Sequence, residues 1–263
     1  MDTKRKIAIV VPCYNEAKRL KLEEFKSYLN KNGSVTFIFV NDGSTDNTLE
    51  MLKSINRMFA DQSLCISQEK NSGKAEAVRQ GFLKAIETGF DYIGYWDADL
   101  SAPLNLLNRL TDRFKSENVT IVMGSRVRLL GRNIMRNAIR HYLGRVFATF
   151  ASLVLDLLVY DTQCGAKVFK NNQELRMVFS QPFTVSWIFD VEILARLKLL
   201  GKLRGRSSLK DSAFEYPLEQ WTDIKGSNVN PFDYFIGFIE LFKIYAYLNF
   251  PVIRRQYVHK VKL

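Results

Sequence analysis

"IAIVVPCYNE" (Ile7–Glu16) runs from five consecutive apolar residues into a proline, a tyrosine and a carboxylate. A short apolar run that ends in polar residues is typical of a strand buried on both faces of a parallel sheet. Because this strand stops abruptly at polar side chains, we expect a polar ligand to bind where it ends.

The same pattern recurs along the first half of the chain. Amphipathic stretches alternate with further apolar runs, which predicts an α/β fold with a mixed, mostly parallel sheet flanked by helices. The expected strands after the first are Val35–Val40, Ser63–Ser67, Tyr92–Trp96 and Val119–Gly124. The expected helices carry the apolar sets Leu22, Phe25 and Leu29, then Leu49, Leu52 and Ile55, then Val78, Phe82 and Ala85.

Composition limits the classes of protein to consider. With 263 residues, 47% of them hydrophobic, the chain can bury a full core. Its three cysteines lack paired spacing and it has two histidines, so we expect any metal to be held by oxygen ligands. The apolar run after Lys6 ends at Pro12 and is too short for a signal peptide, which favours a cytoplasmic protein.

The net charge calls for an anionic partner. There are 38 basic and 27 acidic residues, a formal charge of +11. A phosphorylated ligand, an anionic membrane surface or a nucleic acid would each fit this charge. No recognised nucleic-acid-binding motif is present, so a basic binding module without turnover rests on charge alone, and we expect no nucleic-acid partner.

Four polar clusters follow four of the expected strands. In an open α/β sheet the carboxyl ends of the strands form the edge where ligands bind, so these clusters should share one site. They are "PCYNE" after the first strand, "NDGSTD" after the second, "DADLS" after the fourth and "GSR" after the fifth.

Asp97 and Asp99 lie two residues apart where the fourth expected strand ends, so their side chains can point the same way. Such a pair suits Mg²⁺ or Mn²⁺, which carboxylates commonly hold together with phosphate oxygens. The alternative is that the two aspartates form a capping turn. A buried strand that leads into two carboxylates favours the cation, because their charge otherwise lacks compensation.

Other polar residues at this edge suit a nucleotide. Glu16 and Asp42 can accept hydrogen bonds from a base or ribose, and Tyr14 can stack, although for Tyr14 taken alone core packing is the better explanation. Lys74 lies at a helix start, where an anion can bind. The patterns of P-loop NTPases and of dinucleotide-binding oxidoreductases are both missing.

Taken together, these motifs resemble glycosyltransferase family 2, inverting enzymes with a GT-A nucleotide-sugar fold. The motifs "PCYNE", "VNDGSTDNT", "KNSGKAEAVRQG", "DADLS" and "GSR" occur in the family's order and approximate spacing. Three later stretches look like the branch that glycosylates polyprenyl phosphates, especially the dolichyl-phosphate glucosyltransferases. They are "DTQCGAKVF" (Asp161–Phe169), "WIFDVEIL" (Trp187–Leu194) and "YPLEQWTDIKGSNV" (Tyr216–Val229).

The resemblance implies a domain organisation. A GT-A domain would span residues 1–230, with a nucleotide-sugar half at 1–126 and an acceptor half at 127–230, before an amphipathic helical segment at 231–263. Mannosyl-transferring relatives commonly carry glutamine where this chain has Ser101, which favours UDP-glucose as donor and leaves a third metal contact open. The residues expected to line the nucleoside pocket are Pro12, Tyr14, Glu16 and Asp42, with Lys74 near the phosphates and Asp97 and Asp99 on the metal.

Asp190 matches the family's general base for acceptors that are sugar hydroxyls. A phosphate acceptor needs little such help, because it is already largely a dianion at neutral pH. Two further readings of Asp190 therefore stay open, one in which it orients an acceptor-binding Arg or Lys and one in which it caps a helix. An acceptor with a saccharide or other hydroxyl remains the alternative to a polyprenyl phosphate.

Arginines follow the fifth strand. Arg132, Arg136 and Arg140 would form one stripe if this segment is helical, and with Arg126 they are expected to grip the acceptor phosphate. A solvated surface is the alternative.

The segments Tyr142–Asp161 and Pro231–Arg255 are apolar but interrupted by charges, which predicts amphipathic helices at an anionic membrane surface, on its cytoplasmic face. The oligomeric state stays open.

Overall fold

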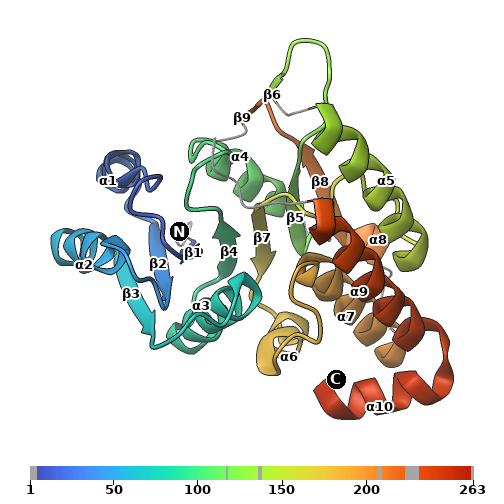
Figure 1. Cartoon of the computed structure of the whole chain (residues 1–263). Coiled ribbons are helices and arrows are strands. Elements are labelled where there is room, and N and C mark those ends of the chain that lie inside the picture. The colour runs from blue at the N-terminus through green and yellow to red at the C-terminus, as the bar shows by residue number, and fades with distance from the viewer. Residues whose placement is uncertain (1–4, 117, 136–137, 206–208, 223–230, 262–263) are drawn as a thin grey trace.

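The computed structural model describes residues 5–116, 118–135, 138–205, 209–222 and 231–261. A seven-stranded sheet in the order β3-β2-β1-β4-β7-β5-β8 forms its centre (Figure 1). Only β7 runs antiparallel to its neighbours within this sheet, so the prediction of a mixed, mostly parallel sheet is confirmed. The strands are β1 (Ile7–Cys13), β2 (Val35–Asp42), β3 (Ser63–Gln68), β4 (Tyr92–Trp96), β5 (Ile121–Ser125), β7 (Ala166–Lys170) and β8 (Ala213–Pro217).

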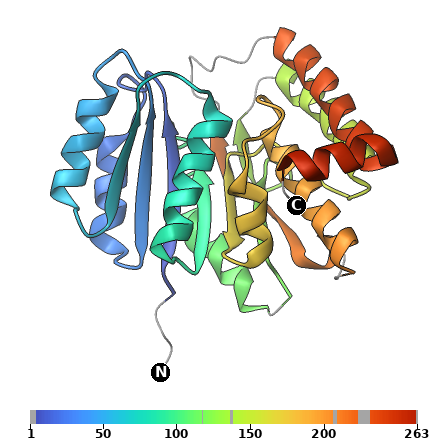
Figure 2. The same cartoon turned by 90° about the horizontal axis from the view of Figure 1, so that it is seen from below.

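Helices cover both faces of the sheet. Side chains of α1, α2 and α4 pack into the core on one face, and those of α3, α6 and α7 pack on the other, where Figure 2 shows α3 and α6 in front of the strands. The helices are α1 (Leu22–Lys31), α2 (Thr48–Met58), α3 (Lys74–Thr88), α4 (Leu106–Asp112), α5 (Ala138–Leu155), α6 (Gln173–Ser180), α7 (Phe189–Arg204), α8 (Leu209–Ser212), α9 (Pro231–Asn249) and α10 (Pro251–Val261), with a 3₁₀ turn at Arg113–Lys115.

The apolar runs form strands because their side chains alternate between two cores. In β1, Ile7, Ile9 and Val11 enter one core, whereas Ala8 and Val10 enter the other. All five strands and the three helices expected in the first half are present. The strand ends lie within two residues of the expected ones, which is the usual uncertainty of an element boundary, and Tyr92–Trp96 is unchanged.

The prediction that the arginines form a stripe on one helix is wrong. Residues Asn133–Met135 form a strand, β6, which pairs with β9 (Gln220–Thr222). Ile134 is buried in this pairing, so burial of an apolar side chain in a small sheet overrides the helical spacing of the arginines. Helix α5 is described from Ala138 onward, and Arg136 lies outside the described residues.

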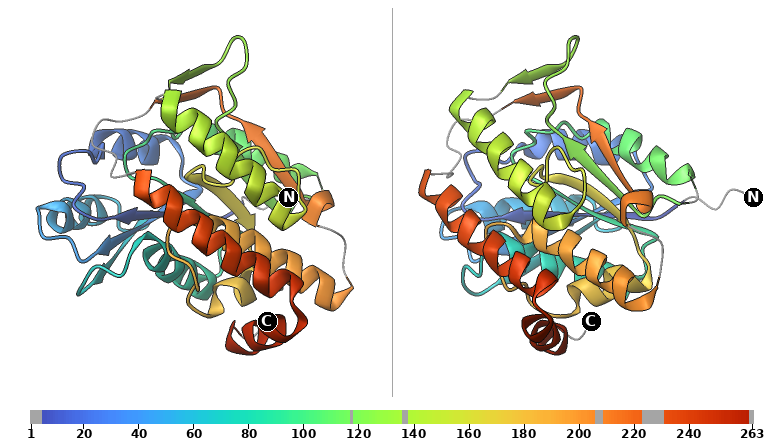
Figure 3. Two further views of the ribbon diagram at one scale, coloured as in Figure 1. Left: turned by 45° about the vertical axis from the view of Figure 1, so that its right-hand side comes forward. Right: turned by 90° about the vertical axis from the view of Figure 1, so that its right-hand side faces the viewer.

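Helices α5 and α9 lie side by side at one end of the sheet, with α10 turning away from α9 (Figure 3). Each buries one side and leaves apolar residues exposed on another. Within the described residues no single helix is long and apolar enough to cross a bilayer. The arms Asp233–Asn249 and Pro251–Lys260 meet that requirement only when counted together, and they are bent by 102°.

A buried hydrogen-bond network around an ion pair of α7 connects this helix to α10. The Arg196 guanidinium donates to Glu192 Oε1 at 2.7 Å, and both side chains are fully buried. The hydroxyl of Tyr257 on α10 donates to the same oxygen at 2.6 Å. Arg196 also donates to the backbone carbonyls of Val178, Gln181 and Pro182. The network satisfies its own buried polar groups, and loss of one partner should therefore be costly.

We expect Arg196→Met to lower the free energy of unfolding by about 3–5 kcal/mol, because it leaves the Glu192 carboxylate buried without its counter-charge. Urea denaturation followed by circular dichroism measures this change. Lys53→Met is the control, since it breaks an exposed pair with Glu50 and should leave the urea midpoint nearly unchanged. Equal midpoints for the two variants would contradict the interpretation.

Candidate active site

Two pockets meet at the carboxyl ends of the parallel strands, and Lys74, Asp97 and Asp99 line both of them. Pocket A has a volume of about 380 Å³ and is lined, besides these three, by Pro12, Cys13, Tyr14, Glu16, Arg19, Asp42, Asn71, Gly73, Ala77 and Ala98. Pocket B has a volume of about 300 Å³ and is lined, besides the shared three, mainly by Ser101, Arg126, Arg140, Arg145, Asp161, Thr162, Ser186, Trp187, Asp190, Trp221 and Tyr234.

Pocket A gathers the four residues expected around a nucleoside. Pro12, Tyr14 and Glu16 come from the end of β1 and the turn after it, and Asp42 comes from the end of β2. Tyr14 is 42% exposed, so it is not a core residue and its ring is open to a ligand. Burial raises the pKa of Glu16, whose carboxylate accepts a hydrogen bond from Arg19 Nε at 3.0 Å.

Asp42 holds the loop that leads into α3. Its carboxylate accepts the backbone N–H of Ser72 at 2.7 Å and of Gly73 at 2.9 Å. Gly73 has a φ of +91°, a conformation that favours glycine, and the helix begins at the next residue, Lys74. Asp42 therefore also positions Lys74. This role could not be predicted from the position of Asp42 in the sequence.

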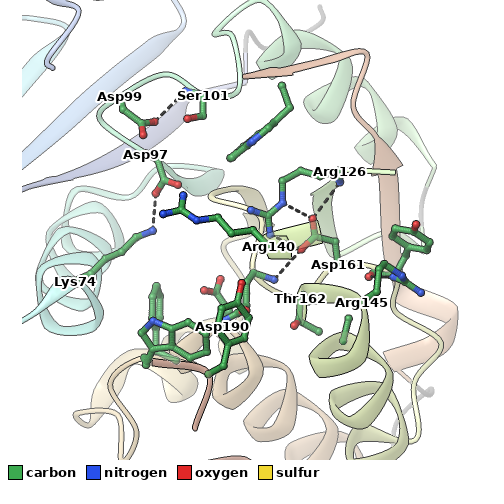
Figure 4. A pocket seen from close by; sticks show the side chains of 18 of the residues that line it. Lys74, Asp97, Asp99, Ser101, Arg126, Arg140, Arg145, Asp161, Thr162 and Asp190 are labelled. Atoms are coloured by element: carbon green, nitrogen blue, oxygen red, sulfur yellow. Dashed lines mark hydrogen bonds and ion pairs between the residues drawn. The ribbon is translucent and has the colours of Figure 1, made fainter. Parts of the chain in front are cut away.

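The junction of the two pockets is built on the end of β4. Asp97 leaves the strand with its N–H donating to Gly165 O at 3.0 Å, and its carboxylate accepts from Lys74 Nζ at 2.6 Å (Figure 4). A Cβ at Gly165 would overlap the Asp97 carboxylate, so only glycine leaves room for it there. Asp99 accepts the N–H of Ser101 at 2.9 Å.

Asp97 and Asp99 fit a hard divalent cation as a pair. Two carboxylates that line one junction can hold Mg²⁺ or Mn²⁺ when phosphate oxygens complete its coordination. No group of three or more His, Cys, Asp or Glu side chains suited to a metal occurs within the described residues. Phosphate oxygens of a nucleotide diphosphate are ligands that can join two carboxylates on such an ion.

Pocket B is lined by three arginines and, besides the shared Asp97 and Asp99, by two further aspartates. Arg126 donates to both oxygens of Asp161, from Nε at 2.5 Å and from a terminal nitrogen at 2.7 Å, and its guanidinium lies 4.9 Å from the Trp221 ring centre. Burial acts to lower the pKa of Arg126, but the charge of Asp161 raises it above its usual value. Arg140 and Arg145 of α5 reach the same pocket, as Figure 4 shows.

The other two predicted arginines are not part of pocket B as described. Arg132 precedes β6 and pairs with Glu219 at 3.1 Å instead. Arg136 lies outside the described residues. Arg126 and Arg140 of the predicted set therefore line pocket B, together with Arg145.

Asp190 lies at the inner wall of pocket B, in the first turn of α7. Its Oδ1 accepts from Lys167 Nζ at 2.6 Å and from the Tyr95 hydroxyl. Burial raises the pKa of Asp190 to about 7 and lowers that of Lys167 to about 8. The N-cap residue of α7 is Ile188, so Asp190 does not occupy the capping position.

Several residues of pocket B were not predicted from the sequence. Asp161 and Thr162 belong to a motif that was noted only for its resemblance, and Trp221 lies on a strand that was not predicted. The same motif contains Lys167, the partner of Asp190. One signal was present, because "DTQC" follows an apolar segment as the other polar clusters do. Its partners are far away in sequence, and only the fold brings them together.

Comparison with known proteins identifies the family. Residues 8–171 match the model of the glycosyl transferase family 2. The dolichyl-phosphate beta-glucosyltransferase of Saccharomyces cerevisiae is 32% identical over an alignment of 243 residues, and the match covers 85% of this chain and 69% of that protein. The human protein of the same name is 29% identical over an alignment of 249 residues, with 87% of this chain and 71% of that protein covered.

Solved structures share the fold. Glucosyl-3-phosphoglycerate synthase from Mycobacterium tuberculosis, in complex with Mn²⁺ and UDP-glucose, aligns with a TM-score of 0.63 at 18% identity over 93% of this chain and 79% of that one. The same enzyme in complex with UDP aligns with a TM-score of 0.60 at 20% identity, covering 93% and 80% of the two chains. The expected GT-A fold is confirmed, and the chain belongs to glycosyl transferase family 2.

Proposed function

We propose that this chain is an inverting, metal-dependent hexosyltransferase that moves glucose from UDP-glucose to a polyprenyl phosphate of the dolichyl type. The observation that carries the proposal is that a pocket suited to a nucleotide meets a pocket rich in arginine at Lys74, Asp97 and Asp99. Relatives named dolichyl-phosphate beta-glucosyltransferase support the same acceptor.

The donor would occupy pocket A. Pro12 and Tyr14 would flank the base, while Glu16 and Asp42 accept hydrogen bonds from the nucleoside. Asp97 and Asp99 would hold Mg²⁺ or Mn²⁺, which when bound supplies positive charge for the leaving diphosphate. Lys74 is placed at the same junction and would stabilise that charge as well.

The acceptor phosphate would occupy pocket B. Arg126, Arg140 and Arg145 supply the charge-assisted hydrogen bonds that a phosphate dianion needs. One phosphate oxygen attacks the anomeric carbon of the sugar from the side opposite the diphosphate. The carbon–oxygen bond to the diphosphate then breaks, its electron pair leaves with UDP, and the configuration inverts. No base is required, since the attacking oxygen carries no proton.

A hydroxyl acceptor is the second candidate. Asp190 lines pocket B, and its pKa, raised to about 7 by burial, suits a general base. Against this role, its Oδ1 already accepts from Lys167 and Tyr95. We favour the phosphate acceptor, with Asp190 acting to hold Lys167 and the wall of the pocket.

We place the reaction at a membrane, on its cytoplasmic face. The apolar face is the set of exposed residues Tyr142, Val146, Phe150 and Leu153 on α5 and Phe235, Phe238, Ile239 and Phe242 on α9. It is continuous, because the rings of Phe150 and Phe238 lie 5.5 Å apart across the two helices. The same two helices contribute Arg140, Arg145 and Tyr234 to pocket B, so a lipid phosphate would enter beside them.

The proposed division of the chain follows the pockets. Apart from the shared residues, pocket A is lined from within residues 1–126, whereas pocket B draws most of its lining from 127–230. Tyr234 adds the segment 231–263 to the site. That segment would both attach the protein to the membrane and complete the acceptor pocket.

A thermal-shift panel of UDP-, GDP- and dTDP-sugars tests the donor and the metal. UDP-glucose with Mn²⁺ should raise the melting temperature most, because a ligand at 100 times its Kd stabilises the folded state by about 2.7 kcal/mol. Asp97→Asn and Asp99→Asn should lose the Mn²⁺-dependent part of this shift. Asp112→Asn, an exposed aspartate on α4, is the control. Full transfer by the two variants without any divalent ion would contradict the proposal.

Asp190→Asn separates the two acceptors. With a polyprenyl phosphate we expect kcat to fall by less than about tenfold, because no proton has to be removed, whereas a hydroxyl acceptor predicts a loss of about 10²–10⁴-fold. Steady-state transfer of radiolabelled glucose from UDP-glucose to polyprenyl phosphate measures this effect. A near-complete loss would favour Asp190 as the general base.

Binding to vesicles tests the apolar face. Leu153→Asp and Phe242→Asp place charges on α5 and α9 at side chains that are 71% and 66% exposed, so the fold should tolerate them. We expect the fraction of protein that floats with anionic vesicles to fall at least tenfold, since a charged side chain opposes burial of the apolar face at the headgroup boundary. Met58→Asp on α2, 56% exposed, is the matched control. Unchanged flotation of the first two variants would count against the membrane assignment.

A further inference from the structure

Glu240 lies within the apolar stretch of α9, yet its side chain is buried. Its Oε1 accepts the backbone N–H of Ser186 at 2.8 Å and the Ser186 hydroxyl at 3.1 Å. Its Oε2 accepts the N–H of Trp187 at 3.0 Å and of Ile188 at 3.1 Å. One carboxylate thus binds three successive backbone amides of the loop between α6 and α7.

This loop forms one wall of pocket B. Ser186 and Trp187 line the pocket, and α7 starts directly afterwards with Phe189 and Asp190, which line it too. A shift of the three bound amides would therefore move the start of α7 as well. The position of the wall depends on α9, a helix that is distant in sequence.

A second contact between the same two elements is independent of the carboxylate. The Trp187 ring lies against α9 at Gly237, where an added Cβ would come within 2.6 Å of the ring. The rings of Tyr234 and Phe147 lie 5.4 and 5.9 Å from the Trp187 ring, centre to centre. Gly237 and Glu240 are three residues apart, so they lie on the same face of α9.

The other side of α9 carries the apolar face. Phe235, Ile239 and Phe242 are exposed, whereas Glu240, one residue after Ile239, points into the protein. The helix that would meet the lipid surface on one side therefore holds a wall of pocket B on the other. Because one helix, α9, carries both features, the distance between a lipid surface and pocket B would be fixed by the width of that helix.

We propose that Glu240 is a positioning residue for the acceptor, which acts by holding Ser186, Trp187 and the start of α7 against α9. The inference rests on the proposed function, because that function assigns pocket B to the acceptor. It extends that function by assigning Glu240 an effect on the acceptor and not on the donor, since pocket A has no lining residue from the loop or from α9. Loss of the Glu240 contacts should weaken binding of the acceptor and leave binding of the donor unchanged.

Steady-state kinetics on the full chain, with polyprenyl phosphate in mixed micelles and UDP-glucose with Mn²⁺, tests this separation. We expect Glu240→Ala to raise KM for polyprenyl phosphate at least tenfold and to change KM for UDP-glucose less than twofold. Glu240→Gln should be intermediate, because its amide keeps one accepting oxygen. Gly237→Ala keeps the carboxylate but displaces Trp187, and should reproduce the rise in acceptor KM.

Ile244→Val is the matched control, since it removes one methyl group from the buried side of α9 without touching the loop. The inference is overturned if acceptor KM stays within twofold in both Glu240→Ala and Gly237→Ala. It is also overturned if both KM values rise together, as a general loss of structure would make them do. A wild-type enzyme that transfers no glucose to polyprenyl phosphate would overturn the proposed function, and this inference with it.

Discussion

The site depends on the close approach of β4 and β7 where Asp97 meets Gly165. These two strands are antiparallel neighbours, so the end of β4 lies beside the start of β7. Glycine at the start of β7 leaves the space that the Asp97 carboxylate occupies, and this brings the carboxylate within 2.6 Å of Lys74. Without that space Asp97 would be displaced, and the two pockets would lose the residue at which they meet.

Buried or partly buried carboxylates hold the loops around this centre. Asp42 accepts two backbone amides of the loop before α3, and Glu215 accepts those of Tyr160 and Asp161. Glu192 accepts the amides of Thr184 and Val185. Glu240 accepts three more from the residues that follow. Charge-assisted bonds of this kind are strong, so the loops gain fixed positions without belonging to the sheet.

Pocket A could be predicted from the sequence because its residues follow parallel strands directly. Pro12, Tyr14 and Glu16 follow one apolar run, and Asp42 and Asp97 end or follow two others, so the direction of the strands alone brings them to one edge. Pocket B could be predicted only in part. Some of its arginines could be named from the sequence, but the geometry comes from contacts between distant segments.

The sequence by itself determined the α/β class, the strands of the first half and the polar edge that lines pocket A, because the apolar spacing and the residues after each strand are local properties. The tertiary structure decided which arginines share pocket B, since burial of Ile134 in a two-stranded sheet removed Arg132 from the expected helix. It also decided the role of Glu240, which in sequence only interrupts an apolar segment. Side chains so far apart in the chain acquire a common role only when the core packs their elements together.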